Sequence, residues 1–494
     1  YRLGLDNYRK YKRINYSSYW LNPFMMRYAM ADQNIALMAH LMRRAGFGAG
    51  REELEARAAK GYEATVEELV NPKEEPIDQY RFVRYHPEFI RTVTLPGMGG
   101  ANWLHTMIAT KRPLEEKMVL FWHQIFATGI SKVDHYNVMN AQLTMFRENA
   151  MGNYRDFLVA LAKDPAMIYW LDNNENHAEA VNENWGRELL ELFSMGVGNY
   201  TEDDVRECSR AFTGWTIAKT PPRAYGRYDW VFEFLESDHD DGEKTFLGHT
   251  GNFDGEDVIG IICQQPATAR FVARHLYNFF VADEPQVPSW SVTPPKDPEA
   301  IEILAKAFGD FGYELKPVLS VLFNSEFFKN ARFAKIKSPI EAVVGAVRFA
   351  GGAEFPAPGI GNLARQSGYM GQELLNPPSV EGWHTGVEWV NSGALMKRIN
   401  FTAGVLGDIE RPGIQTIIGK LQAEGDLAPE DFVNTCLDLA GPLEVKPATH
   451  RELIEHASEK GDLSWNSNQA ANASTARVGE MLKLIASVRE FQYS

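Results

Sequence analysis

Cysteine is scarce in this sequence. Its three cysteines, Cys208, Cys263 and Cys436, lie far apart, and none belongs to a C-x-x-C pair. A zinc ribbon needs paired cysteines and a disulfide framework needs several, so the sequence argues against both. We expect the three thiols to be small, buried side chains.

Long apolar runs and basic clusters are also missing. No stretch of about 18 apolar residues occurs, so we expect no transmembrane helix. Acidic residues outnumber basic ones by 65 to 50, the formal net charge is −15, and no group of lysines and arginines is dense enough to follow a phosphate backbone. We therefore expect no nucleic-acid partner, and the acidic balance repels an anionic membrane surface.

The familiar short catalytic motifs are absent too. The sequence contains no H-E-x-x-H, G-x-S-x-G, G-x-G-x-x-G or P-loop pattern. Any active site must therefore be assembled from distant segments. The chain begins at Tyr1 and not at methionine. This start indicates removal of an export signal, although a truncated chain would look the same.

The residues that are present predict a helical protein. The chain is 45% hydrophobic and 23% charged, which is ordinary for a globular fold. Short segments with helical periodicity alternate with glycine and proline stops, and they predict a mainly α, single large irregular helical body. Alternating aromatics from Tyr225 to Phe234 predict a small β-hairpin excursion near residues 225–250.

Composition and helix-breaking residues along the sequence predict four parts. Residues 1–31, rich in tyrosine, predict an extended aromatic arm, and residues 32–282 an N-terminal helical region. Residues 283–298 form a proline-rich linker or insertion. Residues 299–494 predict a C-terminal helical region packed on the first. Within it, Gly371 to Trp389 has too many helix breakers and predicts a rigid aromatic loop over the body.

The stretch from Asp172 to Trp215 holds the densest set of carboxylates, amides and aromatics. Asn182 is placed to cap a helix over residues 183–195, and Thr201 with Asp204 has the spacing of a capping box. Glu183, Arg187 and Glu191 recur every four residues, which is typical of an exposed ion-pair ladder. The N-E-N-x-x-R-E-L pattern is therefore open to a structural and a functional interpretation.

Two further groups could carry chemistry. His123 and Glu116 fall just beyond the apolar arc of a helix over residues 114–126, so we expect both to be half-buried at the rim of the core. His123 is then either a structural histidine or a ligand. Asp238, His239 and Asp240 form either a polar turn or a cation site. An EF-hand is rejected, because its twelfth position would be Gly248.

Several motifs together resemble a bacterial family known as domain of unknown function 1800. They are R-R-A-G-F-G at Arg43, L-F-W-H-Q-I-F at Leu120, N-E-N-W-G-R-E-L-L-E-L-F at Asn182, Y-T-E-D-D-V at Tyr200, A-F-T-G-W at Ala211, H-D-D-G-E-K-T-F-L-G at His239, P-A-T-A-R-F at Pro266 and P-P-S-V-E-G-W at Pro377. The resemblance implies an exported bacterial protein, periplasmic, at the cell surface or extracellular. The resemblance also implies that such a protein is often made alongside a member of a sulfatase-like family called domain of unknown function 1501. It implies no established activity.

Two functions remain open. The first is an enzyme acting on an extracellular or periplasmic substrate, with a divalent metal ion as its candidate cofactor. Its predicted catalytic residues are Glu183, Arg187, Glu188 and His123, and its predicted metal ligands are Asp238, His239 and Asp240. The second is a secreted binding or assembly protein. It is motivated by the aromatic content of 12% and the tyrosine-rich arm, and its partner would be a sulfatase-like protein or a second copy of this chain.

Overall fold

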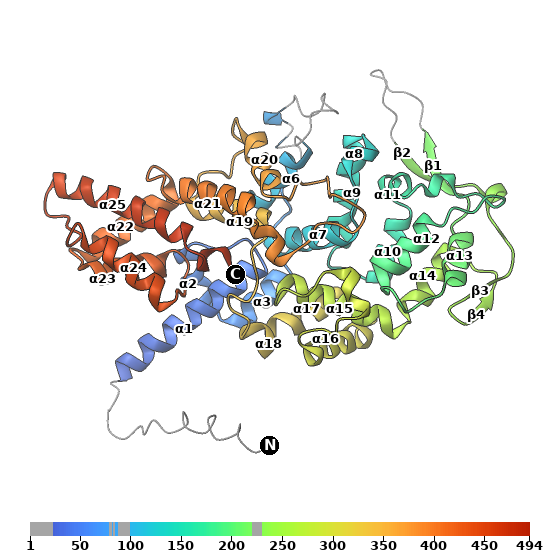
Figure 1. Cartoon of the computed structure of the whole chain (residues 1–494), viewed down its shortest axis with the longest axis horizontal. Helices are drawn as coiled ribbons and strands as arrows, with labels where there is room; N and C mark the ends of the chain where they lie inside the picture. Colours follow the sequence, from blue (N-terminus) through green and yellow to red (C-terminus); the bar gives the residue numbers. More distant parts are fainter. Residues whose placement is uncertain (1–22, 79–81, 83, 87–98, 220–229) are drawn as a thin grey trace, which may run out of the picture.

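The computed structural model describes residues 23–78, 82, 84–86, 99–219 and 230–494. The predicted fold class is confirmed, since helices fill most of this part of the chain and two small antiparallel sheets complete it (Figure 1). The first part of the aromatic arm, residues 1–22, lies outside the described residues. From Pro23 onward the chain is in helix α1 (Pro23–Arg44).

The main helices of the described residues fall into three groups along the chain. Those before the central motif are α2 (Arg51–Lys60), α3 (Tyr62–Val70), α6 (Gly99–Ala109), α7 (Pro113–Ile125), α8 (Ile130–Val133), α9 (Tyr136–Asn149), α10 (Tyr154–Ala162) and α11 (Pro165–Trp170). The central part contains α12 (Asn184–Glu188), the π-helix η2 (Leu189–Ser194), α13 (Glu202–Ala211), α14 (Gly255–Cys263) and α15 (Pro266–Phe280). The last part contains η4 (Val287–Ser291), α16 (Pro298–Asp310), α17 (Leu315–Asn324), α18 (Glu326–Lys329), α19 (Pro339–Ala350), α20 (Ile360–Tyr369), η5 (Gly386–Val390), α21 (Ser392–Leu406), α22 (Pro412–Glu424), α23 (Pro429–Leu439), α24 (Pro447–Ser458) and α25 (Asn468–Ser487).

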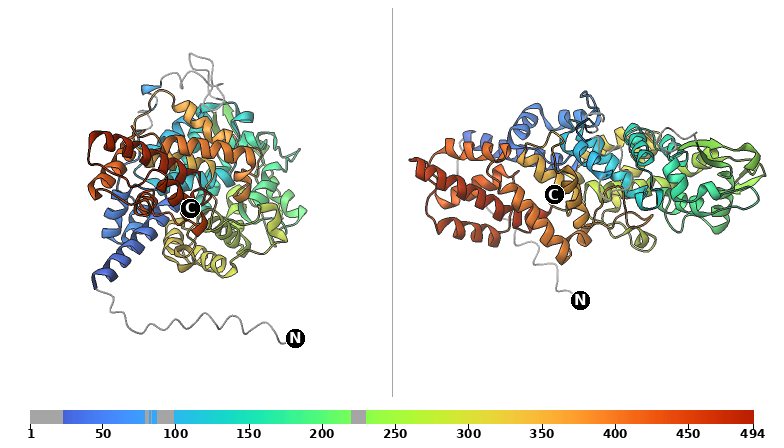
Figure 2. Two further views of the ribbon diagram at one scale, coloured as in Figure 1. Left: turned by 60° about the vertical axis from the view of Figure 1, so that its left-hand side comes forward. Right: turned by 90° about the horizontal axis from the view of Figure 1, so that it is seen from above.

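Two hydrophobic cores hold these helices together. The larger core draws buried side chains from Met38 to Leu375, and the smaller one draws them from Ala346 to Ala486. Helix α19 contributes Val343 and Val347 to the first and Ala346 to the second, so it joins the two. In Figures 1 and 2 the molecule is elongated, with α22–α25 at one end, the strands at the other and α7 and α19 between them. The four-part division of the chain stays a prediction.

Helix α7 is buried on almost every side. Twelve of its thirteen residues are buried, including His123 at 0% and Glu116 at 2% exposure. The prediction that these two lie half-buried at a rim is therefore wrong. An apolar arc marks the buried face only when the opposite face meets water, and here other helices cover that face as well. Glu116 then needs internal partners, and it accepts hydrogen bonds from Arg147 (2.7 Å) and Trp103 (2.9 Å).

The central motif is helical, but it is not one continuous α-helix. The α-helical part begins at Asn184, one residue later than predicted, and the side chain of Asn182 accepts from the Asn184 amide at 3.0 Å. After Glu188 the chain switches to a π-helix. The predicted capping box of Thr201 with Asp204 is confirmed. Gly186 allows α12 and α13 to touch, because a Cβ there would lie 2.2 Å from Ser209 Oγ.

The predicted hairpin excursion is present as two small sheets. Strand β1 (Trp215–Lys219) pairs with β2 (Trp230–Phe234), with Ile217 opposite Phe232. Strand β3 (Lys244–Phe246) pairs with β4 (His249–Gly251). The residues between β1 and β2 that the hairpin prediction began with, 225–229, lie outside the described residues. Both sheets lie at one end of the molecule (Figure 1).

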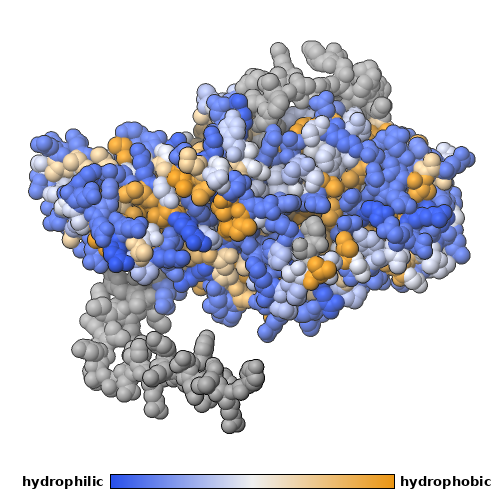
Figure 3. Space-filling model, viewed as in Figure 1, coloured by the Kyte–Doolittle hydropathy of each residue, from blue (hydrophilic) through white to orange (hydrophobic). Residues whose placement is uncertain are grey.

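The face of the molecule drawn in Figure 3 is mostly hydrophilic. On the face drawn in Figure 3, apolar residues are interspersed among a larger number of polar ones. No helix in the described part of the chain combines the length and apolar character needed to cross a membrane.

Candidate functional site

Glu188 lies among other carboxylates, unlike the other predicted catalytic residues. It is the last residue of α12, at the junction with the π-helix, and it is half-buried. Within the described residues it has no ion-pair partner. Burial and then the nearby charge of Glu191 raise the pKa of Glu188 to about 7; Arg187 opposes them, and Glu381 adds a smaller rise. Glu188 can therefore hold a proton near neutral pH.

The π-helix η2 places Glu191 beside Glu188. A π-helix inserts an extra residue into the turn and changes which side chains share a face, and such turns are frequent at functional sites. Ser194 stabilises it by donating to the Leu189 carbonyl at 2.5 Å. Tyr200 fixes the carboxylate of Glu191 by donating its phenol hydrogen at 3.1 Å. Burial and then Glu191 raise the pKa of Tyr200, so it remains a hydrogen-bond donor.

Glu381 reaches the same place from the loop before η5. The next residue, Gly382, has φ +80°, and a Cβ there would lie 2.0 Å from the Gln124 carbonyl at the end of α7. Only glycine allows this approach. Trp383 is buried and its ring centroid lies 5.4 Å from that of His123. The prediction of a non-helical aromatic segment packed on the body is confirmed up to the short helix η5, its rigidity stays a prediction, and the ring of His123 lies against Trp383.

Glu191 and Glu381 line an open cleft of about 860 Å³. Asn199, which follows η2, also lines the cleft. Further lining residues come from α15, η4 and α16 and the residue before α15, and they include Gln265, Arg270, Phe271, Arg274, Trp290, Ser291 and Glu302.

The charges along the cleft do not balance. Arg270 pairs with Glu302 at 2.6 Å, and Arg274 pairs with the buried Glu284 at 2.7 Å. Both arginines are therefore neutralised locally. Among the described residues, neither Glu191 nor Glu381 has a lysine or arginine partner; Glu381 has only His384, at 4.0 Å. The surplus charge of the cleft is negative, which favours neutral or cationic ligands.

A family model described as protein of unknown function (DUF1800) matches residues 40–493, nearly the whole chain. The chain belongs to this family. No curated protein and no solved structure matches it. The motif that carries Glu188 and the loop that carries Glu381 both lie within the residues that the DUF1800 model matches.

The remaining predicted catalytic residues lie apart from this cluster. Arg187 pairs on the surface with Glu183 at 3.3 Å and with Glu202 at 2.7 Å. The predicted ladder therefore continues to Glu202 on α13 and not to Glu191. His123 is enclosed in the core, and burial lowers its pKa to about 3. Neither of its ring nitrogens has a hydrogen-bond partner within the described part of the chain.

The predicted metal ligands are all used in contacts within the chain. Asp238 bonds His177 at 2.5 Å, and His239 bonds the Thr213 carbonyl at 2.8 Å. Asp240 accepts from Arg210 at 2.7 and 3.1 Å, and these bonds are the main reason its pKa is lowered. No group of three or more His, Cys, Asp or Glu among the residues described is arranged to hold a metal ion. The metal assignment stays a prediction, and this geometry adds nothing to it.

Sequence reasoning missed Glu381 and Tyr200. Both stand inside motifs that match the family, P-P-S-V-E-G-W and Y-T-E-D-D-V. The sequence signal that could have indicated Glu381 is its position directly before Gly382 and Trp383 in a segment rich in helix breakers. Nothing in the sequence shows that this loop ends beside Glu188, because about 190 residues separate them.

Proposed function

We propose that this protein is an exported enzyme that holds a neutral or amine-bearing glycan in the cleft and uses Glu188 as a general acid. The observation that carries the proposal is the half-buried carboxyl of Glu188, whose pKa burial and the two cleft-lining carboxylates, Glu191 and Glu381, raise to about 7. A general acid works best when its pKa lies near the working pH. Enzymes that cleave glycosidic bonds commonly combine such an acid with a second carboxylate.

The lining of the cleft supports this class of substrate. Asn199, Gln265 and Ser291 offer neutral hydrogen-bonding groups, and Phe271 and Trp290 offer apolar ring surface. Sugars present both hydroxyls and apolar ring faces. The negative surplus from Glu191 and Glu381 disfavours acidic polymers, and it favours an amine.

The chemistry assigned to each group is limited. Glu188 donates its proton to the oxygen of the bond that breaks, and it recovers a proton from the water that completes hydrolysis. Glu191, oriented by Tyr200, stabilises the positive charge that develops on the sugar. Binding energy along the cleft orients the bond between them. No step in this proposal uses a metal ion.

The test is a panel of neutral, amino and acidic oligosaccharides, with release of new reducing ends as the readout. Wild type should cleave a neutral or amino member and lose activity above about pH 7, as the acid loses its proton. Glu188→Gln should lower kcat at least about 100-fold. Glu183→Gln, which changes an exposed glutamate of the same motif, should stay within about twofold. Full activity of Glu188→Gln on any cleaved member would end the proposal.

A binding or assembly role is the second proposal, and a different observation favours it. Tyr369, Val387 and Met396 are 57%, 76% and 65% exposed, on α20, η5 and α21, and α21 contacts both of the other two elements. Large apolar side chains grouped on a surface are common in partner interfaces. The partner would be a sulfatase-like protein or a second copy of this chain. Val387→Asp with Met396→Asp should then abolish a complex detected by size-exclusion chromatography, while Ile303→Asp on α16 should not.

A further inference from the structure

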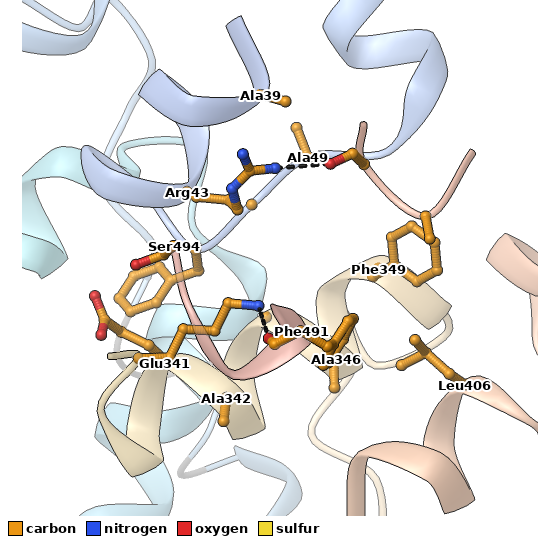
Figure 4. A pocket seen from close by; sticks show the side chains of 16 residues that line it. Ala39, Arg43, Ala49, Glu341, Ala342, Ala346, Phe349, Leu406, Phe491 and Ser494 are labelled. Carbon is orange, nitrogen blue, oxygen red and sulfur yellow. Dashed lines mark hydrogen bonds between the residues drawn. The ribbon is translucent and has the colours of Figure 1, made fainter. Parts of the chain in front are cut away.

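A second pocket lies far along the molecule from the cleft, where α1, α19 and α21 meet (Figure 4). Its volume is about 80 Å³. Much of its wall is apolar, with Ala346, Phe349, Leu406 and Phe491 among its lining residues. Two cations, Arg43 and Lys337, also line it. Arg43 stands in the R-R-A-G-F-G motif, to which neither proposed function assigns a role.

Both cations have more donors than partners. Arg43 donates to the Gly441 carbonyl at 2.7 Å, and Lys337 donates to the Phe491 carbonyl at 2.7 Å. A guanidinium carries about five N–H donors and an ammonium about three. Within the described residues, neither side chain has an ion pair with a carboxylate, and Nε and Nη2 of Arg43 are buried without a hydrogen-bond partner.

The one carboxylate side chain among the lining residues is already committed. Glu341 forms an ion pair with the buried Lys117 and accepts from the Ser338 amide at 2.7 Å. Arg398 adds a third cation, which is fully buried and donates to the Lys337 carbonyl at 2.8 Å. Positive charge is therefore in excess around this pocket. Burial, and then Arg43 and Arg398, lower the pKa of Lys337 to about 7.

We propose that this pocket binds a small oxyanion between Arg43 and Lys337. An anion placed there gains two charge-assisted hydrogen bonds and neutralises cations that burial otherwise disfavours. The volume limits the ligand to a few heavy atoms, the size of a short-chain carboxylate or of phosphate. The apolar wall suits the alkyl end of a carboxylate. The pocket is separate from the cleft, so a negative result for anion binding would not refute the proposed enzyme activity.

The first experiment measures thermal unfolding of the whole protein with sodium butyrate, sodium phosphate or sodium chloride at equal ionic strength. At least one of the two oxyanions should raise the Tm by several degrees more than chloride does. A larger rise with butyrate identifies a carboxylate, and a larger rise with phosphate an inorganic ion. Equal Tm values in all three salts would overturn the proposal.

Two variants distinguish a role of Lys337 in binding the oxyanion from a role in stabilising the fold. Lys337→Met should lose the oxyanion-dependent rise, yet it should be at least as stable as wild type in chloride, because it removes an uncompensated charge. Lys397→Met, which changes an exposed lysine on α21, should keep the rise. An oxyanion effect that survives in Lys337→Met would also overturn the proposal.

A chemical measurement on the unaltered protein gives a second readout. Acetic anhydride reacts with neutral amines, so Lys337 should be acetylated early at pH 7.5, as followed by peptide mass spectrometry. A bound oxyanion stabilises the charged ammonium and covers it. Butyrate or phosphate should therefore slow acetylation of Lys337 at least about fivefold and leave Lys397 unchanged. Equal rates with and without the oxyanions would contradict the site.

Discussion

Glu188 and Glu341 are the same kind of side chain held in opposite charge states. Burial is the largest influence on each, and by itself it raises the pKa of both. Around Glu188 the neighbouring carboxylates add to that effect, and the pKa is about 7. Around Glu341, Lys117, Lys335 and Arg44 together outweigh burial, and the pKa is about 2. The sign of the surrounding charge decides which glutamate can donate a proton.

The two pockets differ in the same way. The cleft beside Glu188 has a negative surplus, since its arginines are paired. The pocket beside Glu341 has a positive surplus, since its carboxylate is paired and Arg43 and Lys337, within the described residues, bond carbonyl oxygens and lie over the rings of Phe333 and Phe491 without an ion-pair partner. One chain thus offers a proton donor for a neutral or cationic ligand and a cationic pocket for an anion. The predictions below test this contrast.

Glu341→Gln should give the largest effect. Glutamine keeps the shape of the capping box with Ser338, but it leaves the buried cations around it without their shared counter-charge. Breaking a buried pair in this way costs about 3–5 kcal/mol. Denaturant unfolding should show this loss. The control Glu302→Gln, in an exposed pair with Arg270, should cost below about 1 kcal/mol. Similar values for the two variants would refute the contrast.

The stability that Glu341 contributes should also depend on pH. Its pKa is lower in the folded protein than in the unfolded chain, so its contribution is present above the unfolded value of about 4.5 and is lost as the pH falls towards 2. The cost of Glu341→Gln should accordingly shrink between pH 5 and pH 3.

Gly382→Ala should disrupt the loop that brings Glu381 to the site. The new methyl group would meet the Gln124 carbonyl, and alanine is strained at φ +80°. We expect a loss of about 2–3 kcal/mol in the free energy of unfolding. Gly248→Ala is the matched control, because Gly248 has φ +81° and nothing within 4 Å of the added Cβ. Equal losses would mean that backbone strain alone is responsible and that the loop does not need its close approach to α7.

Glu188→Gln should stabilise the protein at high pH. The folded pKa of about 7 is above the unfolded value, so the folded state is penalised as the pH rises from about 4.5 to 7. The variant removes that penalty. After screening of this half-buried group, we expect a gain of about 1–2 kcal/mol at pH 8 and none at pH 4. Thermal unfolding at the two pH values measures the difference, and a pH-independent change would argue against a raised pKa.

Arg187→Gln should give the smallest effect. Its pairs with Glu183 and Glu202 are exposed, so the loss should stay below about 1 kcal/mol. The same change should raise the pKa of Glu188 slightly, because Arg187 lowers it in the wild type. A loss above about 2 kcal/mol would show that the ladder is a framework element of the motif.

Periodicity and punctuation in the sequence predicted most of the fold. Glycine and proline stops, the Thr201 capping box and the alternating aromatics all depend on residues close in sequence, and local structure follows from them. Periodicity failed at His123 and Glu116, because an arc on a helical wheel cannot show that a helix is covered on all sides. The π-helix after Glu188 could not be predicted either, since the residue pattern there is that of an ordinary α-helix.

The site was predictable only in part. Glu188 was selected because the family motif centres on it, and so were Glu183 and Arg187, which lie on the surface. What separates them is their partners: Arg187 pairs with Glu183, whereas Glu188 has no ion-pair partner among the described residues and the charge of Glu381, from a distant loop, raises its pKa. The proximity of residues so far apart in the sequence depends on tertiary packing, and it cannot be predicted from a single sequence.

The most direct test of the account is the titration of Glu188 itself. Carbon-13 NMR of the glutamate carboxyl groups would follow it, with its signal assigned by its absence in Glu188→Gln. We predict a pKa near 7 in wild type and a lower value in Glu191→Gln, where one repelling charge is gone. A wild-type pKa below about 5, close to the ordinary range for glutamate, would contradict the central claim that Glu188 keeps its proton at neutral pH.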